Sequence, residues 1–254
     1  MARKPRTKSR SGIYHIMLRG INRQIIFEDE QDKYRLLETI ERFKEISKFE
    51  IYSFCLMDNH VHLLIKETEE SISKIIQRIS SSYVYWYNNK YERSGHLFQE
   101  RFKSENVETV PYFFTVLRYI HQNPLKAGIA SNVFESQWTS IHEYIENKPR
   151  LIDVELAFKL FSPDRAKAIH LFTQYMQMSN NDQCMDNHIK VRLTDNEVIS
   201  CLAKLGIPNS YQLQQMERNE RDQILVKLKT LNGVSHRQLS RITGLSKSVI
   251  TRAR

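Results

Sequence analysis

The sequence has few of the residues on which disulfide-rich, fibrous or low-complexity proteins depend. Its 254 residues include 3 cysteines, 7 glycines and 6 prolines, and no low-complexity tract. Cys55, Cys184 and Cys201 lie far apart without the paired spacing of a zinc site, so we expect reduced thiols. No apolar run approaches a membrane span, and no signal-peptide core follows the basic N-terminus. These absences favour a globular, cytoplasmic protein without a membrane partner.

Acidic residues are missing from both ends of the chain, although the whole chain carries a formal net charge of +9. The stretch from Arg237 to Arg254 is basic without acids, and so is an N-terminal arm, residues 1–11, that contains Arg3, Lys4, Arg6, Lys8 and Arg10. Basic arms of this kind usually contact nucleic acid phosphates. A solvated tail that only aids solubility is the alternative for the N-terminal arm.

Apolar periodicity predicts an α+β domain over residues 12–148. The expected order is strand, helix, strand, strand, helix, strand and helix, over residues 13–19, 30–48, 50–57, 60–66, 71–90, 97–107 and 112–123. The first six elements match a ferredoxin-like or RRM-like antiparallel sheet with helices on it. A short helix completes the domain, and Pro149 is a plausible boundary.

No strand signal follows the boundary, so residues 149–254 are expected to be all-α. The last piece, residues 235–254, has the pattern of a helix-turn-helix with Gly244 at the turn. Its second helix would present Lys247 and Arg252 to a DNA major groove. A helical hairpin that only packs is the alternative.

Two histidines alternate with apolar residues in the predicted strand 60–66. Successive side chains of a strand point to opposite faces, so His60 and His62 share one face. Such a pair can bind a metal ion. It can also be the solvent-exposed face of a half-buried strand and have no function.

The predicted helix 112–123 carries a phenol and an amide on one face, because Tyr119 and Asn123 are four residues apart. If this helix lies over His60 and His62, two imidazoles, an amide oxygen and a tyrosine hydroxyl meet. This donor set suits Mg²⁺ or Mn²⁺ with open positions for phosphate oxygens. Attack of a tyrosine on phosphorus gives a covalent phosphotyrosine, which retains a phosphodiester that a DNA hydroxyl can later attack.

Other tyrosines compete with Tyr119 for such a role. Tyr83 and Tyr87 fall on the apolar stripe of the predicted helix 71–90, so we expect them in the core. Tyr85 and Tyr91 could stack on bases, but no metal-ligand pattern lies near them.

Four segments carry these motifs in a fixed order, and together they span most of residues 12–130. They are residues 14–20, residues 54–64 with the two histidines, residues 95–102, and residues 118–124 with the tyrosine. In this order they resemble the HUH single-tyrosine transposases, and most closely the REP-associated tyrosine transposases. The resemblance does not extend over residues 150–254.

The resemblance implies a metal-dependent single-stranded DNA endonuclease and strand transferase with a 5′-phosphotyrosine intermediate. Its implied substrate is hairpin DNA of the palindromic repeat kind, and its implied cofactor is Mg or Mn. His60 and His62 would be metal ligands, Tyr119 the nucleophile and Asn123 the third ligand. Broader single-tyrosine transposases tend to have glutamine at the last place, so the adjacent Gln122 is the alternative.

We expect basic side chains near these segments to hold the DNA backbone, because guanidinium groups suit phosphate oxygens. The candidates are Arg19, Arg23, Arg101, Lys103 and Arg118. Two other functions are compatible with the sequence: a rolling-circle replication initiator or relaxase-type nicking enzyme, and a non-catalytic DNA-binding regulator. Both a monomer and a homodimer are compatible with the sequence.

Overall fold

The computed structural model describes most of the chain, namely residues 7–182, 184–185, 195–207, 212–231 and 234–253. The chain divides into two compact units, residues 1–187 and residues 188–254. The boundary expected near Pro149 does not coincide with this division. Helices α6 (Glu155–Phe161) and α7 (Arg165–Gln177) contribute buried apolar side chains to the core of the first unit.

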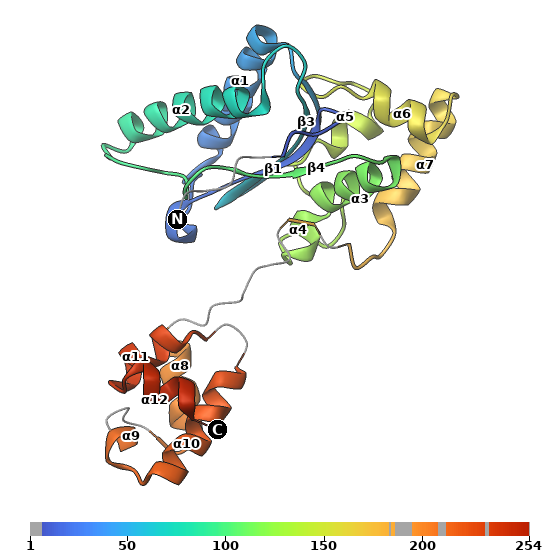
Figure 1. The fold of residues 1–254 in the computed structure, drawn as a ribbon. Coiled ribbons are helices and arrows are strands. Elements are labelled where there is room, and N and C mark those ends of the chain that lie inside the picture. Colours follow the sequence, from blue (N-terminus) through green and yellow to red (C-terminus); the bar gives the residue numbers. More distant parts are fainter. Residues whose placement is uncertain (1–6, 183, 186–194, 208–211, 232–233, 254) are drawn as a thin grey trace. The chain divides into compact units, whose positions relative to one another are not determined.

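A four-stranded antiparallel sheet lies at the centre of the first unit, in the order β2-β3-β1-β4 (Figure 1). The strands are β1 (Ile13–Arg19), β2 (Glu50–Met57), β3 (His60–Lys66) and β4 (Lys103–Asn106). β2 and β3 form the predicted hairpin, and β3 lies beside β1. The predicted α+β fold with an antiparallel sheet is confirmed.

The fourth strand is shorter than the predicted range of residues 97–107. Glu100 has a φ of 54°, in the left-handed region, which interrupts extended backbone. Before it, an isolated bridge joins Phe98 to Gly20, and after it β4 pairs with β1. The segment between these two pairings is therefore a loop at the edge of the sheet.

Helices cover both faces of the sheet (Figure 1). α1 (Glu30–Ser47) and α2 (Ile72–Lys90) lie on one face, and α3 (Val110–His121) lies on the other. β3 is consequently buried at all positions except its last residue. A strand that is buried on both faces has a nearly continuous apolar sequence, so the histidines of β3 are the exception that needs a chemical reason.

α3 begins at Val110, two residues before the predicted start, because Thr109 accepts a hydrogen bond from the backbone of Tyr112 at 3.3 Å and Pro111 stands in the first turn. It ends at His121, two residues before the predicted end. A one-turn helix, α4 (Asn123–Lys126), follows and contains Pro124. Proline cannot donate a backbone hydrogen bond, so the helical ladder is broken at this place.

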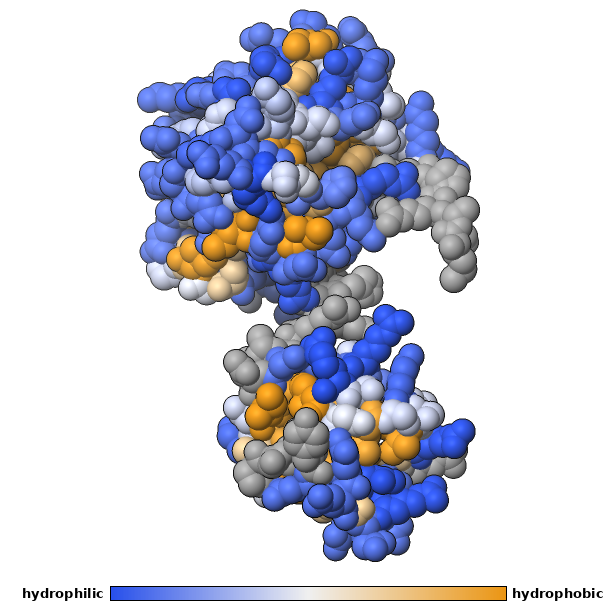
Figure 2. Space-filling model, turned by 90° about the vertical axis from the view of Figure 1, so that its left-hand side faces the viewer, coloured by the Kyte–Doolittle hydropathy of each residue, from blue (hydrophilic) through white to orange (hydrophobic). Residues whose placement is uncertain are grey.

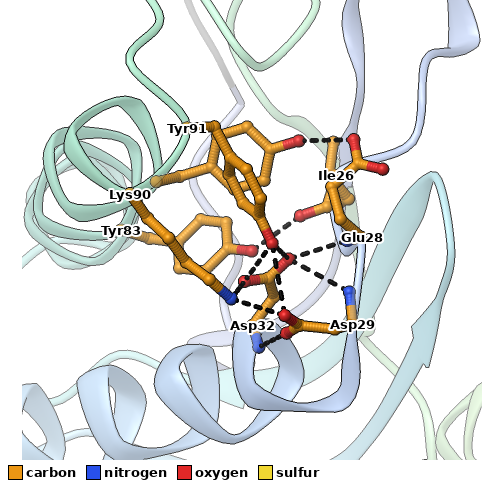
Figure 3. A network of polar contacts seen from close by, with 8 residues as sticks. Ile26, Glu28, Asp29, Asp32, Tyr83, Lys90 and Tyr91 are labelled. Atoms are coloured by element: carbon orange, nitrogen blue, oxygen red, sulfur yellow. Dashed lines mark hydrogen bonds and ion pairs between the residues drawn. The ribbon is translucent and has the colours of Figure 1, made fainter.

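A network of polar contacts ties the start of α1 to the end of α2 (Figure 3). Asp29 and Asp32 form a reciprocal capping box at the first turn of α1. The carboxylate of Asp32, which is 0% exposed, also accepts from Lys90 at 2.7 Å and from Tyr91 at 3.0 Å. One buried carboxylate therefore satisfies groups on both helices.

Replacement of Asp32 by alanine should lower the free energy of unfolding of the first unit by about 3 kcal/mol. The change removes one half of the capping box at the start of α1. It also removes the carboxylate that binds the partly buried ammonium of Lys90. Both tryptophans, Trp86 and Trp138, belong to the first unit, so urea denaturation followed by tryptophan fluorescence measures this effect. Glu38→Ala, an exposed change on the same helix, is the control and should shift stability by less than about 0.5 kcal/mol. Equal shifts for both variants would contradict the assigned role of Asp32.

The second unit is helical throughout its described part. Its helices are α8 (Asp195–Lys204), α9 (Gln212–Gln215), α10 (Arg218–Thr230), α11 (His236–Thr243) and α12 (Lys247–Arg252). Its core includes Val198, Leu202, Leu225, Leu228, Leu239 and Ile250. The predicted helical C-terminal region is confirmed.

Gly244 joins α11 to α12 with a φ of 69°, a conformation that glycine adopts without strain. Ser246 then caps α12 by accepting from the backbone of Val249 at 3.4 Å. Lys247 and Arg252 are exposed on α12. Two helices joined at Gly244 therefore lie within residues 235–253, and the helix-turn-helix remains a prediction.

The faces of both units that Figure 2 displays are mostly hydrophilic, with hydrophobic patches between the polar side chains. Tyr85 of α2 is the most exposed large hydrophobic side chain among the described residues, at 73%. Within the described residues, every helix is too short or too polar to cross a membrane.

Candidate active site

His60 and His62 are buried in β3, with exposed fractions of 8% and 0%. Their ring centroids are 5.0 Å apart and the ring planes are nearly perpendicular, at 89°. Antiparallel pairing places Arg19 opposite His60 and Met17 opposite His62, so these β1 side chains lie on the same face. Because both side chains are buried, the two histidines are not the solvent-exposed face of a half-buried strand. Burial of a polar imidazole costs free energy unless the ring makes hydrogen bonds.

One ring nitrogen of each histidine is held by a neighbouring side chain. Nδ1 of His60 lies 2.6 Å from Oδ1 of Asn59, and Nδ1 of His62 lies 2.9 Å from Nε2 of His15. Metal-bound histidines usually use their second nitrogen in this way, which fixes the tautomer and the orientation of the ring. Nε2 is therefore the nitrogen with which each histidine would bind a metal ion.

His15 and Glu105 extend this chain of contacts. His15 is 0% exposed, and its Nδ1 lies 4.0 Å from Oε2 of Glu105 on the neighbouring strand β4. His15 was not among the site residues expected from the sequence. The alternation of β1 was the available signal, since His15 shares a face with Arg19.

Tyr119 of α3 meets the histidines across the face of the sheet. Its ring centroid is 5.6 Å from that of His62 and 5.8 Å from that of His15, and its side chain is 4% exposed. The ammonium of Lys126 lies 5.2 Å from the centroid of the same ring. Lys126 was not among the expected site residues, because it lies on α4, beyond the break in the helical ladder of α3.

The structure separates the two candidates for the third ligand. The amide nitrogen of Gln122 donates to the carbonyls of Met176 at 2.7 Å and Met178 at 3.0 Å, and its oxygen accepts from Asn180 at 2.7 Å. Asn123 is 8% exposed, and its amide makes no hydrogen bond to the described residues. Gln122 thus has a structural task, whereas Asn123 has a buried amide that suits a ligand.

A segment that we call the strap, residues 178–182, runs along α3 and α4. Asn180 accepts from the ammonium of Lys126 at 3.1 Å. Asp182 binds the guanidinium of Arg118 with two hydrogen bonds, of 2.8 and 3.0 Å. The strap, with the end of α7, therefore holds the helix that carries Tyr119.

This contact changes the expected role of Arg118. Its side chain is buried at 8% exposed, binds Asp182, and lies 4.2 Å from the ring centroid of Tyr175. Arg118 thus stabilises the fold and leaves the set of residues that we expect to contact DNA.

The other basic candidates are on or near the surface. Lys103 pairs with Met17 and lies on the face of the histidines, as does Arg19. Arg23 and Arg101 are exposed in the loops that follow β1 and precede β4. These four residues remain candidates for binding the DNA backbone, whereas Lys247 and Arg252 belong to the second unit and are described only within it.

His121 is buried beside the site but has a structural task. Its Nε2 lies 2.9 Å from Oγ of Ser140, and its ring packs against Tyr144 and Phe172. Burial lowers the pKa of His121 to about 3, against a hydrogen bond to the backbone of Leu117 that favours the charged form. The residue is therefore neutral at physiological pH.

Replacement of His121 by glutamine should reduce the loss of unfolding free energy that occurs as the pH falls below 6.5. The unfolded chain binds a proton near pH 6.5, but folded His121 binds it only near pH 3, so stability is lost as the pH falls below 6.5. This site contributes a slope of up to about 1.4 kcal/mol per pH unit. Urea denaturation between pH 5 and 7 measures it. His170→Gln is the control, because His170 is exposed. If the pH dependence of unfolding free energy were unchanged in His121→Gln but reduced in His170→Gln, buried His121 would not be its source.

The competing tyrosines have structural partners. The hydroxyl of Tyr83 donates to the carbonyl of Ile26 at 2.6 Å, and that of Tyr87 donates to Glu28 at 2.9 Å. Figure 3 shows Tyr83 and Tyr91 directed at the start of α1. Tyr119 is consequently the candidate nucleophile that the structure places beside the histidines.

The donor set can be tested against a divalent cation. No group of three His, Cys, Asp or Glu side chains suited to a metal lies within the described residues. Two imidazoles whose Nδ1 atoms are each held by a neighbouring side chain, and the buried amide of Asn123, provide a set of nitrogen and oxygen donors instead. This set fits a cation that keeps open positions for phosphate or water.

Comparison with known proteins agrees with this geometry. The family described as "Transposase IS200 like" matches residues 8–123. A solved REP-associated tyrosine transposase bound to a REP hairpin is 18% identical with a TM-score of 0.50, over 60% of this chain and 94% of that chain. A candidate transposase from Deinococcus radiodurans R1 is 16% identical with a TM-score of 0.35, over 48% of this chain and 97% of that chain. No curated protein matches the sequence.

At 18% identity, the likeness to the REP-associated tyrosine transposase concerns the fold alone, and the family match concerns residues 8–123. The matched residues contain β1, the hairpin with His60 and His62, and α3 with Tyr119. Residues 8–123 of this chain therefore match the IS200-like transposase family.

Proposed function

We propose that the protein is a metal-dependent endonuclease and strand transferase for single-stranded DNA, with Tyr119 as the nucleophile. The observation that carries this proposal is the contact between Tyr119 and His62, whose ring centroids are 5.6 Å apart. A buried phenol beside two buried imidazoles is the arrangement that such chemistry requires.

His60 and His62, through Nε2, and Asn123, through its amide oxygen, would hold the cation. When bound, Mg²⁺ or Mn²⁺ would polarise the phosphate and stabilise the charge that develops on it. The hydrogen bond between His62 and His15 supports this assignment, because it orients the ring that would bind the ion.

The chain's own residues carry out the cleavage. The phenol oxygen of Tyr119 attacks phosphorus, the bond between phosphorus and the 3′ oxygen breaks, and the phenol proton is balanced by protonation of the released 3′-hydroxyl. The product is a 5′-phosphotyrosine link. Since the number of phosphodiester bonds is conserved, a 3′-hydroxyl can reverse the step or join a new strand without ATP.

The proposed substrate is a DNA hairpin of the palindromic repeat kind with a single-stranded flank. Arg19 and Lys103, on the face of the histidines, and the exposed Arg23 and Arg101 are suited to bind its phosphates. The solved relative bound to a REP hairpin supports this choice of substrate. Lys247 and Arg252 on α12 would add contacts to double-stranded DNA.

The test incubates the full chain with labelled hairpin DNA and Mg²⁺ or Mn²⁺, followed by denaturing electrophoresis. A covalent protein–DNA band and a free 3′-hydroxyl are expected, and a chelator should remove both. Absence of the band with hairpins drawn from the repeats near the gene would overturn the proposal.

The helix-turn-helix arrangement of α11 and α12 favours a second candidate, a DNA-binding regulator without catalysis. This candidate predicts hairpin binding that a chelator does not change and no cleavage at any metal concentration. The same gel therefore separates this regulator from a nuclease, whereas a relaxase-type nicking enzyme would also give the covalent band.

A further inference from the structure

A carboxylate on the neighbouring strand faces the histidine that holds His62. Antiparallel pairing places Glu105 of β4 opposite His15 of β1, on the same face of the sheet. Oε2 of Glu105 is buried and lies 4.0 Å from Nδ1 of His15, although the whole side chain is 41% exposed. Nε2 of His15 lies 2.9 Å from Nδ1 of His62. His15 therefore stands between a carboxylate and a proposed metal ligand.

The hydrogen bond between the two rings has two alternative directions. When both imidazoles are neutral, each ring carries one proton, and one proton lies between Nδ1 of His62 and Nε2 of His15. If His62 donates, its Nε2 keeps the lone pair that a cation needs. If His15 donates instead, the proton of His62 is on Nε2, and that nitrogen cannot bind a cation. The direction of this bond therefore decides whether His62 is a ligand.

The charge of Glu105 favours donation from His62. A carboxylate accepts hydrogen bonds and donates none, so it attracts an N–H group and repels a nitrogen lone pair. Its Oε2 lies within ion-pair distance of Nδ1 of His15, and charges on buried atoms are screened weakly. The proton of His15 is therefore stabilised on Nδ1. Nε2 of His15 is then an acceptor, and His62 donates to it.

His60 needs no such support, because its partner is an amide oxygen. Nδ1 of His60 lies 2.6 Å from Oδ1 of Asn59, and a carbonyl oxygen only accepts hydrogen bonds. The proton of His60 is consequently on Nδ1 whatever residue occupies position 105. The partner of His62 is a ring that can donate or accept, so the tautomer of His62 depends on a third residue. His60 thus serves as an internal reference for an effect of Glu105.

We propose that Glu105 is a positioning residue of the metal site, which acts on His62 through His15. It holds the proton of His15 on Nδ1, and so keeps Nε2 of His62 unprotonated and available to the cation. Metal-binding histidines commonly bond to a carboxylate with their second nitrogen, and here a second imidazole is inserted between the two. The inference rests on the proposed function, because His62 is a ligand only if the protein binds a divalent cation.

The test replaces Glu105 by glutamine in the full chain. Glutamine keeps the size of the side chain, but its amide can present either its oxygen or its nitrogen to His15 and no longer dictates the position of the proton. In the metal-free protein, ¹H–¹⁵N NMR correlations of the imidazole rings identify the nitrogen that carries the proton. We expect one dominant tautomer of His62, with the proton on Nδ1, in the wild-type chain and a mixture in Glu105→Gln. The ring of His60 should be unchanged.

Metal affinity provides a second measurement. Titration of the full chain with Mn²⁺, followed by electron paramagnetic resonance of the free ion, should show about tenfold weaker binding in Glu105→Gln. Glu69→Gln is the matched control, because Glu69 is exposed in the loop between β3 and α2 and the change removes the same charge. It should leave both the tautomer of His62 and the Mn²⁺ affinity unchanged.

The outcomes separate this inference from the proposed function. An unchanged tautomer of His62 or an unchanged Mn²⁺ affinity in Glu105→Gln would overturn the inference, and so would an equal effect of Glu69→Gln. Weaker affinity with an unchanged tautomer would mean that the carboxylate acts through its charge alone. If the wild-type chain bound no Mn²⁺, the metal role of His62 would fail and the inference with it. If both measurements change as expected but no covalent band forms on hairpin DNA, the inference stands and the proposed nuclease fails.

Discussion

Tyr119→Phe is expected to abolish the covalent protein–DNA band and to reduce strand cleavage by at least about 10³-fold. The substitution removes only the hydroxyl, so the ring contacts with His62 and His15 and the contact with Lys126 should persist. Hairpin affinity should therefore change by less than about twofold. Denaturing electrophoresis measures the covalent product, and a gel-shift titration measures affinity.

Tyr112→Phe is the matched control for this prediction, because Tyr112 lies on the same helix and is partly buried. Burial and a hydrogen bond to Glu105 raise the pKa of the Tyr112 hydroxyl, which makes it a poor nucleophile. The control should keep the covalent band. A band of normal strength in Tyr119→Phe would remove Tyr119 from the mechanism.

His62→Ala should reduce cleavage by more than about 10²-fold at any metal concentration, because it removes a proposed ligand. His15→Ala should be milder, with a loss of about 10- to 100-fold, since His15 only orients the ring of His62. Added Mn²⁺ should restore much of the activity of His15→Ala but little of that of His62→Ala. Initial cleavage rates as a function of metal concentration separate these outcomes.

His142→Ala provides the control for these two variants, because His142 is exposed on α5 (Ile141–Ile145) and lies outside the site. Its rate and metal dependence should equal those of the wild-type chain. Equal metal dependence in His15→Ala and the wild-type chain would show that the hydrogen bond between the two histidines does not position the ligand.

Much of the fold follows from apolar periodicity. The stripe that predicted residues 71–90 as a helix corresponds to α2, whose positions Ile75, Ile79 and Tyr83 are buried. The edge loop before β4 was not predictable, because the left-handed backbone of Glu100 is set by tertiary contacts and not by a glycine signal. The boundary after α7 was also missed, because a proline in a loop resembles a linker even where the following helices return to the same core.

The site was predictable where local rules apply. Alternation puts His60 and His62 on one face, and this rule needs no tertiary information. The role of His15 depends on which strands are neighbours, and the role of Arg118 depends on Asp182, which is 64 residues away. Contacts at such distances in sequence cannot be read from a local pattern, so the oriented histidine and the buried ion pair required coordinates.

The strap sets the shortest piece of the chain that can be expressed as a nuclease domain. A fragment that stops near Pro149 would leave the buried guanidinium of Arg118 without the carboxylate of Asp182, at a cost of several kcal/mol. It would also lack the carbonyls that hold Gln122 and the amide that holds Lys126. Truncation studies of this protein should therefore end after residue 185, where the helix that carries Tyr119 keeps all of these supports.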